Sequence, residues 1–453
     1  MNCKEYDIII VGGGSSGTVL TKKINKLGYN ICLIEQGPDI LLDGYSISKG
    51  IPYRGSAGFH YSNIETGNKI LKSSVEFWRN YPDVYPNNIT YYLVMKNSVP
   101  NPEKVINIYE QYKETYYELI NKYPKLVERY GAYDDFFKIL DKNSEEYNNL
   151  KNLFKKDYFE NIKYIVKTFE GLIDGEKFIK NIKNEIKHEN IDIYLNQKVN
   201  IIKEYNSYYI LETNNTIYKS PIVILNTWHM NESLIKTIKI DNKLPIITKR
   251  LKGLCNILIN SEWCDNFQIE CFFECMCAGF MLSIYKNNIK NINGNKYYYA
   301  KITYTPITNI YKYTDINEPI WIHDLIRYGR VLENNEKYIP ENLKYKINNI
   351  DKLIIDGISE KIKGFKDNII FSNVIYGIVC TENDIDEIII KEFSKEDSTL
   401  NIRSYSGVYE LKKDKNKLLI ANYGIKFTYC IENSNEIINI LKEFNYKNFS
   451  DLN

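Results

Sequence analysis

Apolar and polar positions in the first forty residues follow one regular order. A continuous apolar run, residues 7–11 (DIIIV), is typical of a buried strand in a parallel sheet. A glycine-rich turn follows, and then Leu20, Ile24 and Leu27 recur at helical spacing. A second apolar run occupies residues 30–34 (NICLI). The order of strand, glycine turn, helix and strand predicts a βαβ unit in a parallel sheet.

The same periodicities predict elements further along the chain. Asn101 before Pro102 and Asp174 are expected to begin helices. The other expected helix starts near residue 431, and the expected strands lie at residues 191–202, 208–213, 216–218, 221–227, 271–285, 296–305 and 417–421. Together these elements predict an α/β fold (α+β overall), with a strand-rich second part.

The overall charge argues against a nucleic-acid or membrane-surface partner. The 453 residues contain 59 Lys and Arg against 57 Asp and Glu, a formal net charge of +2. This balance argues against a nucleic-acid or membrane-surface partner, because both require a basic excess or stripe. No apolar run approaches the roughly 18 residues of a membrane span, and Asp7 stands where a signal peptide would be apolar. We therefore expect a cytoplasmic protein with a small-molecule substrate.

Cysteine and tyrosine supply little candidate chemistry. The nine cysteines are scattered, as expected of reduced thiols. Cys271, Cys275 and Cys277 lack the repeated pairs of a structural zinc site, so we expect no metal. With 40 tyrosines in the chain, packing is the default role for any one of them.

The glycine turn, residues 12–17 (GGGSSG), fits the pattern G-x-G-x-x-G. In that pattern, Gly12 permits the tight turn, Gly14 admits a pyrophosphate close to the backbone, and Gly17 packs the helix on the strand. Glu35 ends the second strand, where an acid accepts hydrogen bonds from an adenosine ribose. The predicted dinucleotide contacts of this unit are Gly12, Gly14, Ser15, Ser16, Gly17, Glu35 and Gln36.

Residues 7–39 resemble the opening of FAD-dependent oxidoreductases, both of the glucose–methanol–choline family and of the D-amino-acid oxidase/glycine oxidase superfamily. The N-terminal position of the unit, and the exit of the chain through Gln36-Gly37-Pro38, favour FAD over NAD. A glucose–methanol–choline enzyme should continue with R-G-x-x-x-G-G-S-S, but residues 54–58 read RGSAG. It should also carry a catalytic histidine near its end, and the last of the four histidines is His323. The D-amino-acid oxidase-like superfamily is therefore the better match.

This second resemblance implies further FAD contacts. By position, Val199 corresponds to the adenine contact, and Asn226 begins the turn near the cofactor, although the glycine expected in that turn is missing. The C-terminal strand, glycine turn and helix correspond to the segment that closes over the flavin, with the positive end of the helix towards the ring. That segment contributes Gly424, Ile425, Lys426 and Phe427.

The resemblance also implies a division of the chain. We expect a Rossmann-like FAD-binding domain from residues 1–84, 161–245 and 366–453. Residues 85–160 and 246–365 are expected to form a discontinuous, strand-rich substrate or cap domain, whose sheet roofs the flavin.

Four residues are candidates for catalysis or substrate binding. His60 is a predicted catalytic residue, as a flavin contact, a covalent attachment point or a base; a hydrogen-bonded loop histidine is the alternative. Tyr299 is predicted to orient the substrate. Arg54 and Arg250 are candidate carboxylate ligands, and a solvated arginine is the alternative for Arg54.

The expected activity is hydride transfer from a C–H bond beside an amine or hydroxyl to flavin N5, with a small amine, amino acid or hydroxy compound as substrate. A catalytically impaired flavoprotein with a structural or binding role is the second hypothesis. An NAD-dependent dehydrogenase is the third, and the return of the chain to the first domain at its far end disfavours it.

Overall fold

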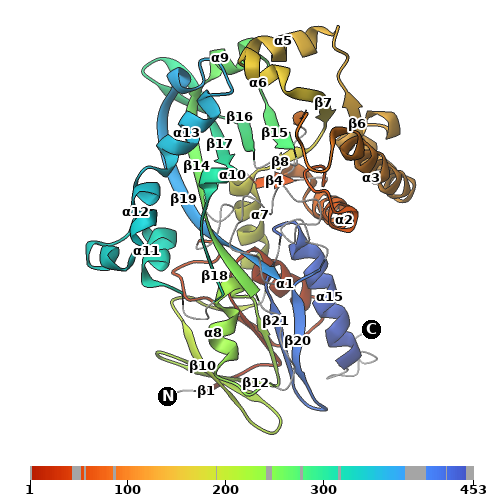
Figure 1. The fold of residues 1–453 in the computed structure, drawn as a ribbon. Helices are drawn as coiled ribbons and strands as arrows, with labels where there is room; N and C mark the ends of the chain where they lie inside the picture. The colour runs from red at the N-terminus through yellow and green to blue at the C-terminus, as the bar shows by residue number, and fades with distance from the viewer. Residues whose placement is uncertain are drawn as a thin grey trace.

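The structure is a computed structural model that describes residues 3–42, 53–55, 58–84, 88–189, 191–240, 247–275, 279–314, 318–382, 405–424 and 426–444. Two large sheets dominate it (Figure 1). A six-stranded sheet lies in the lower part of the view and a nine-stranded sheet in the upper part.

The six-stranded sheet is the predicted parallel sheet. Five strands run parallel and one edge strand, β20, is antiparallel. In spatial order they are β20 (Val408–Lys413), β21 (Leu418–Asn422), β13 (Ile222–Leu225), β2 (Ile8–Val11), β3 (Ile31–Ile34) and β9 (Asp192–Tyr194). Strands β2, β3, β13 and β21 are buried at every residue, as expected of a parallel sheet that is covered on both faces.

Helices cover one face of this sheet and a smaller sheet covers the other. Ile8 and Ile10 belong to a cluster with residues of α1 (Ser15–Asn25), α7 (Gly175–Lys187) and α15 (Tyr429–Phe444). Ile9 and Val11 belong to a cluster with the four-stranded sheet. That sheet has the order β1 (Cys3–Glu5), β12 (Ile217–Ser220), β11 (Tyr209–Thr213), β10 (Val199–Glu204). The lower half of the molecule is thus a three-layer sandwich.

The nine-stranded sheet is mostly antiparallel. Its order is β18 (Asn309–Tyr313), β14 (Ile247–Asn260), β17 (Asn295–Tyr304), β16 (Phe280–Ile292), β15 (Cys271–Cys275), β5 (Thr90–Met95), β7 (Ile162–Thr168) and β6 (Phe137–Ile139), and β19 (Ile369–Glu382) pairs along β14. Strands β14 and β19 have 14 residues each and run from the upper part of the molecule into the lower part.

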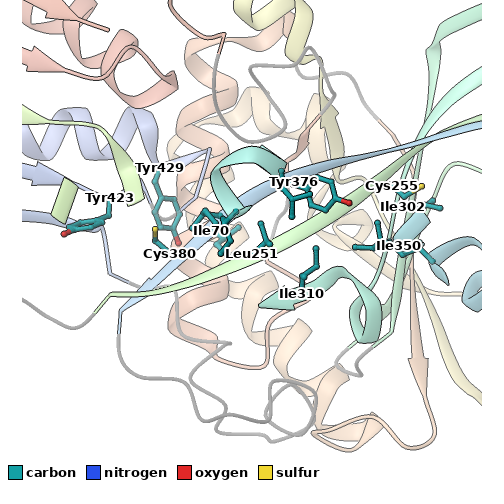
Figure 2. Packing of buried hydrophobic residues seen from close by; sticks show 14 of the residues in the cluster. Ile70, Leu251, Cys255, Ile302, Ile310, Ile350, Tyr376, Cys380, Tyr423 and Tyr429 are labelled. Carbon is teal, nitrogen blue, oxygen red and sulfur yellow. The ribbon is translucent and has the colours of Figure 1, made fainter. Parts of the chain in front are cut away.

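The two faces of the nine-stranded sheet differ in character. Leu251, Cys255 and Ile302 are buried in one apolar cluster with residues of α11 (Ile320–Tyr328) and α13 (Ile350–Ser359). Figure 2 shows this packing around Ile350 and Tyr376, and its continuation to Tyr423 and Tyr429 of the lower half. The opposite face meets α2 (Ile64–Asn80), α3 (Pro102–Lys122) and a two-stranded sheet of β4 (Tyr53–Gly55) and β8 (Gly171–Ile173).

The remaining helices are short. They are η2 (Pro82–Val84), η3 (Pro124–Leu126), α4 (Val127–Tyr130), η4 (Tyr133–Asp135), α5 (Glu145–Leu153), α6 (Lys156–Glu160), η5 (Trp228–Met230), α8 (Asn231–Ile235), α9 (Ser261–Asn266), α10 (Thr305–Thr308), η6 (Glu333–Tyr338), α12 (Glu341–Asn348) and η7 (Lys366–Asn368). Across the described ranges, no helix combines the length and the apolar character that crossing a bilayer requires.

Most elements expected from the sequence are present, but two of the ranges expected as strands were wrong. Residues 271–285 do not form a single strand, because β15 ends at Cys275, β16 begins at Phe280, and the two strands pair antiparallel. The side chains of Asn101 and Asp174 cap α3 and α7 by accepting hydrogen bonds from Lys104 N and Lys177 N. Residues 191–202, predicted as one strand, form β9 and β10 in two different sheets. Asn196 adopts a positive φ of 55° between them, which breaks the extended run.

The division into two domains stays a prediction. Strands β7 and β19 lie within ranges assigned to the FAD-binding domain, and both are strands of the nine-stranded sheet.

Candidate functional site

The glycine turn after β2 is shaped by two close approaches of the backbone. Gly12 has a φ of 105°, and a Cβ there would lie 2.6 Å from the carbonyl oxygen of Asn226. A Cβ on Gly17 would lie 1.9 Å from Gly12 O, so only glycine lets α1 begin this close to the strand. A Cβ on Gly14 would meet no described atom within 4 Å. The turn is therefore tight against the protein at Gly12 and Gly17 and open on the side of Gly14.

The first turn of α1 presents an uncompensated N-terminus to this open side. Gly14 is the N-cap, no side chain caps the helix, and the first turn holds no acidic residue. The leading N–H groups of a helix have no partner within the helix, and the helix dipole places partial positive charge there. Ser15 and Ser16 lie in this turn and are partly exposed. The arrangement suits an anion such as a phosphate.

Glu35 lies against the same turn. Its Oε2 accepts a hydrogen bond from Gly13 N over 2.6 Å, and its Oε1 accepts one from Gly37 N over 2.7 Å. The neighbouring Gln36 is exposed.

The segment that leads to Val199 is hydrogen-bonded to the Glu35 segment. Gln197 N donates to Glu35 O over 3.0 Å, and Asn196 N donates to Gly37 O over 2.9 Å. Val199 then starts β10 and is buried. The structure thus brings Val199 to the side of the glycine turn (residues 12–17) where Glu35 lies.

Four buried asparagines join the turn after β13 to the turn after β21. Asn422 Nδ2 donates to Asn226 Oδ1 over 2.9 Å, and Asn422 Oδ1 accepts from Asn433 Nδ2 over 2.9 Å. Asn231 Nδ2 donates to Asn422 O over 3.0 Å. Asn226 is only 8% exposed, and its Nδ2 has no hydrogen-bond partner among the described residues. A buried amide with a spare donor beside the glycine turn is a position where a ligand acceptor is expected.

Trp228 occupies the place where the sequence lacks the expected glycine. Its φ is +55°, a conformation that glycine adopts readily and that a bulky side chain rarely adopts. The turn is held by Asn231, whose Oδ1 accepts from Thr227 N over 2.9 Å and from Thr227 Oγ1 over 2.7 Å. The backbone shape of a glycine turn is therefore present without the glycine.

The C-terminal turn lies against the start of α1 and reaches Tyr61 through Lys426. A Cβ on Gly424 would lie 3.3 Å from Ser16 Oγ, so this turn contacts the start of α1. Lys426 Nζ is 4.9 Å from the centre of the Tyr61 ring. Phe427 packs against Phe77 and Phe178 of α2 and α7, with ring centres 5.1 and 5.2 Å apart. Ile425 lies outside the described residues.

His60 contacts its chain neighbour Tyr61 and the nine-stranded sheet. Its ring centre lies 4.0 Å from that of Tyr61 and 5.1 Å from that of Phe273 on β15. It is partly exposed. Arg54 lies on β4, where its backbone pairs with Leu172, and its side chain lies outside the described part of the structure.

The face of the nine-stranded sheet above His60 carries the other predicted residues. Tyr299 pairs with Tyr285 across β17 and β16, and both lie in a cluster with Leu172 and Cys271. Arg250 is 2% exposed and lies in register with Lys312 on β18. By strand alternation, Arg250 shares the face of Asn256 on β14.

Sequence reasoning missed Lys301, which is buried at 5% exposure on this face. Burial lowers the pKa of its amine to about 8. The sequence did contain a sign of this residue: a lysine stands inside the strand pattern YYYAKIT, two residues after Tyr299 and therefore on the same face of the strand. It was obscured because exposed lysines are so common in this chain.

Comparison with solved structures shows the fold. L-α-glycerophosphate oxidase from Mycoplasma pneumoniae with FAD bound is similar over 97% of this chain and 95% of its own, with a TM-score of 0.58 and 14% identity. L-proline dehydrogenase from P. horikoshii (98% and 94% covered, TM-score 0.56, 12% identity) and glycine oxidase from Geobacillus kaustophilus (97% and 95%, 0.56, 11%) are similar as well. No family model and no curated protein sequence matches. The chain therefore shares its overall fold with these three structures, in agreement with the α/β fold (α+β overall) predicted from the sequence.

Proposed function

We propose that this chain binds FAD and is an oxidoreductase acting on a small amine, amino acid or hydroxy compound. The observation that carries the proposal is the shape of the glycine turn after β2. Glycine is required at Gly12 and Gly17, whereas the side of Gly14 is open. Asn226 Nδ2 is buried beside this turn without a partner among the described residues. Closed backbone packing next to an open, donor-rich surface is the feature that a pyrophosphate needs.

The residues present fit the cofactor. Gly14, Ser15 and Ser16 would hold the pyrophosphate at the start of α1, and Glu35 would accept hydrogen bonds from the ribose hydroxyls. Val199 would contact the adenine. Lys426 and the start of α15 would supply positive charge near the flavin, where it stabilises the reduced form. The remaining proposed contacts are Gly12, Gly17, Gln36, Asn226, Gly424, Ile425 and Phe427.

Bound flavin would supply the two-electron acceptor for a hydride from the substrate. The chain itself would orient the substrate on the face of the nine-stranded sheet that carries Tyr299 and Arg250. We propose that His60 and Tyr299 contact the reacting groups and that Arg250 and Arg54 hold a substrate anion. The similar structures support this class of substrate, since they are named for proline, glycine and glycerophosphate.

We propose the same domain division as before, with residues 1–84, 161–245 and 366–453 holding FAD and residues 85–160 and 246–365 forming the cap.

The test is spectroscopic. The purified full-length chain should be yellow, or should become yellow on incubation with FAD and gel filtration, and the flavin spectrum should bleach when the right substrate is added without oxygen. A colourless protein that takes up no FAD would refute the proposal. Retained FAD that no amine, amino acid or hydroxy acid reduces, while light with a sacrificial donor does, would favour a flavoprotein with a structural role.

A further inference from the structure

A row of polar residues crosses the nine-stranded sheet at Lys301. Register pairs place Asn256 of β14 opposite Lys301 of β17, Lys301 opposite Ser283 of β16, and Ser283 opposite Cys271 of β15. Side chains of register partners lie on the same face, about 5 Å apart at Cβ. The neighbouring strands continue the row with Thr90 and Thr168. A buried sheet face with so few apolar side chains in one row is unusual for a core.

The row lies between the two candidate catalytic residues. On the same face of β17, Tyr299 lies two residues before Lys301 and Thr303 lies two residues after it. Thr303 is in register with Met281 of β16, which in turn is in register with Phe273 of β15. Phe273 contacts His60. Lys301 is therefore the central residue of the face that the proposed function assigns to the substrate.

The surroundings favour a neutral amine at Lys301. The side chain is 5% exposed, and burial lowers its pKa to about 8, so a substantial fraction is uncharged slightly above neutral pH. Ser283 is 1% exposed, and its Oγ has no hydrogen-bond partner among the described residues. A buried hydroxyl beside a buried amine provides polar contacts for a ligand.

The titratable groups on this face are mostly neutral or cationic. Described side chains on the same face, or packed against it, include those of Tyr285, Tyr299, Cys271, Arg250, Lys252, His60 and Glu170. Glu170 accepts a hydrogen bond from Tyr92 of β5, and β15 and β16 separate β5 from the strand of Lys301.

We propose, as an extension of the proposed function, that Lys301 is the catalytic base that takes the proton from the amine or hydroxyl group of the substrate. The substrate C–H bond would break, and its hydrogen would leave with both bonding electrons, as a hydride, to the flavin acceptor. The N–H or O–H bond breaks, its electron pair forms the new C=N or C=O bond, and the proton forms the third N–H bond of the Lys301 ammonium. The substrate loses two electrons and two hydrogens: the flavin would gain one hydrogen with both electrons, as the hydride, and Lys301 would gain the other as a proton. Lys301 returns its proton to solvent afterwards.

The test compares Lys301→Met with Lys296→Met, a change of an exposed lysine on the same strand. Both variants should bind FAD like the wild type. Lys301→Met should lose about 10²- to 10⁴-fold in the rate of anaerobic flavin reduction, and ethylamine in the buffer should restore part of it to a Lys301→Ala variant. The wild-type rate should fall below about pH 8, and this limb should be absent from Lys301→Met.

A second readout needs neither activity nor cofactor. Because the amine pKa is lower in the folded chain, the wild type binds fewer protons than its unfolded state between about pH 8 and the ordinary value of 10.5. The urea midpoint of Lys301→Met should therefore exceed that of the wild type at pH 7, and the excess should shrink as the pH rises through this range.

The outcomes separate the two proposals. A wild type that takes up no FAD refutes the proposed function, and the base role is refuted with it. An FAD-bound Lys301→Met variant that reduces its flavin within threefold of the wild-type rate overturns the base role alone. The base role is also overturned if flavin reduction is slow in Lys301→Met but keeps the wild-type pH profile, and if amines do not restore the rate of Lys301→Ala. That result would indicate that Lys301 has only a structural role.

Discussion

The side chain of Asn422 donates from Nδ2 to Oδ1 of Asn226 over 2.9 Å, and so joins the turns that follow β21 and β13. The same Asn422 accepts from Gly424 N and from Asn433 Nδ2 through its Oδ1. One residue thus fixes the C-terminal turn, the start of the last helix and the turn beside Gly12. These are the segments that the cofactor would contact together.

Replacing Asn422 with Ala should disrupt this joint. The change leaves the Asn226 amide, the Asn433 amide and Gly424 N without their present partners in a buried place. We expect a loss of about 2–4 kcal/mol in the free energy of unfolding, at about 1 kcal/mol or more for each broken buried hydrogen bond. Urea denaturation measures it. Asn215→Ala, at an exposed hairpin position, should leave the midpoint unchanged; equal midpoints for the two variants would contradict the prediction.

Gly14→Val should separate folding from cofactor binding. The new Cβ meets no described atom within 4 Å, so the free energy of unfolding should change by less than about 1 kcal/mol. The side chain would occupy the place of the pyrophosphate, and FAD affinity should fall about tenfold or more, which corresponds to about 1.4 kcal/mol. Fluorescence quenching of added FAD measures the affinity.

Variants at two other glycines serve as controls for Gly14→Val. Gly17→Val should fail in folding as well, because its Cβ would lie 1.9 Å from Gly12 O. Gly294→Asn, at an open hairpin turn with a φ of 81°, should affect neither property. If Gly14→Val bound FAD like the wild type, the pyrophosphate would have to lie elsewhere.

Glu318 should make stability depend on acidic pH. Burial raises the pKa of Glu318, but hydrogen bonds from His229 and Tyr313, together with the charge of His229, lower it by more, so the net pKa lies below 4.5. A depressed carboxyl pKa contributes stability that is present above the unfolded value of about 4.5 and is lost as the pH falls through the folded value. Urea midpoints between pH 3 and 7 should show this loss.

His229→Gln should reduce that acid-dependent contribution and lower the free energy of unfolding at pH 6 by about 1 kcal/mol. The reason is that a glutamine amide can donate a hydrogen bond to Glu318 but carries no charge. His188→Gln, at an exposed helix end, is the matched control. Parallel pH curves for the wild type and His229→Gln would show that this pair does not carry the effect.

Cys3 should be the fast-reacting thiol among the seven described cysteines. Cys3 is exposed and the other six are buried, and burial raises the pKa of Cys264 and of Cys430 to about 12. Cys3→Ser should remove one equivalent from the rapid phase of labelling by a chromogenic disulfide reagent under native conditions. Cys430→Ser should remove none. A rapid phase of unchanged size in Cys3→Ser would contradict the assignment.

The sequence predicted those parts of the site that depend on local backbone rules. The turn at Gly12 and Gly17, the acid at the end of β3 and the cap at Asp174 each follow from residues a few positions apart. Trp228 shows the limit of this reasoning, because the Asn231 side chain holds a left-handed turn there without glycine. Asn231 then contacts Asn422, 191 residues away, and no local rule anticipates that pairing.

Lys301 was missed for a related reason. The burial of its amine depends on β14 and β16 pairing on either side of β17, and strand order is set by tertiary packing. The single predicted strand over residues 191–202 failed because its two halves hydrogen-bond to different sheets. Apolar periodicity identifies a strand and gives no information about its neighbours.

The ladder between β14 and β19 has a mechanical consequence. Its register runs from Ile247 opposite Glu382 to Ile259 opposite Ile369. It therefore connects the upper part of the nine-stranded sheet to the ion pair of Lys249 and Glu232 in the lower half. Hinge rotation of one half against the other would have to bend or unzip this pair of strands, at the expense of many backbone hydrogen bonds. The molecule should therefore behave as a stiff frame in which a substrate is admitted by small local rearrangements.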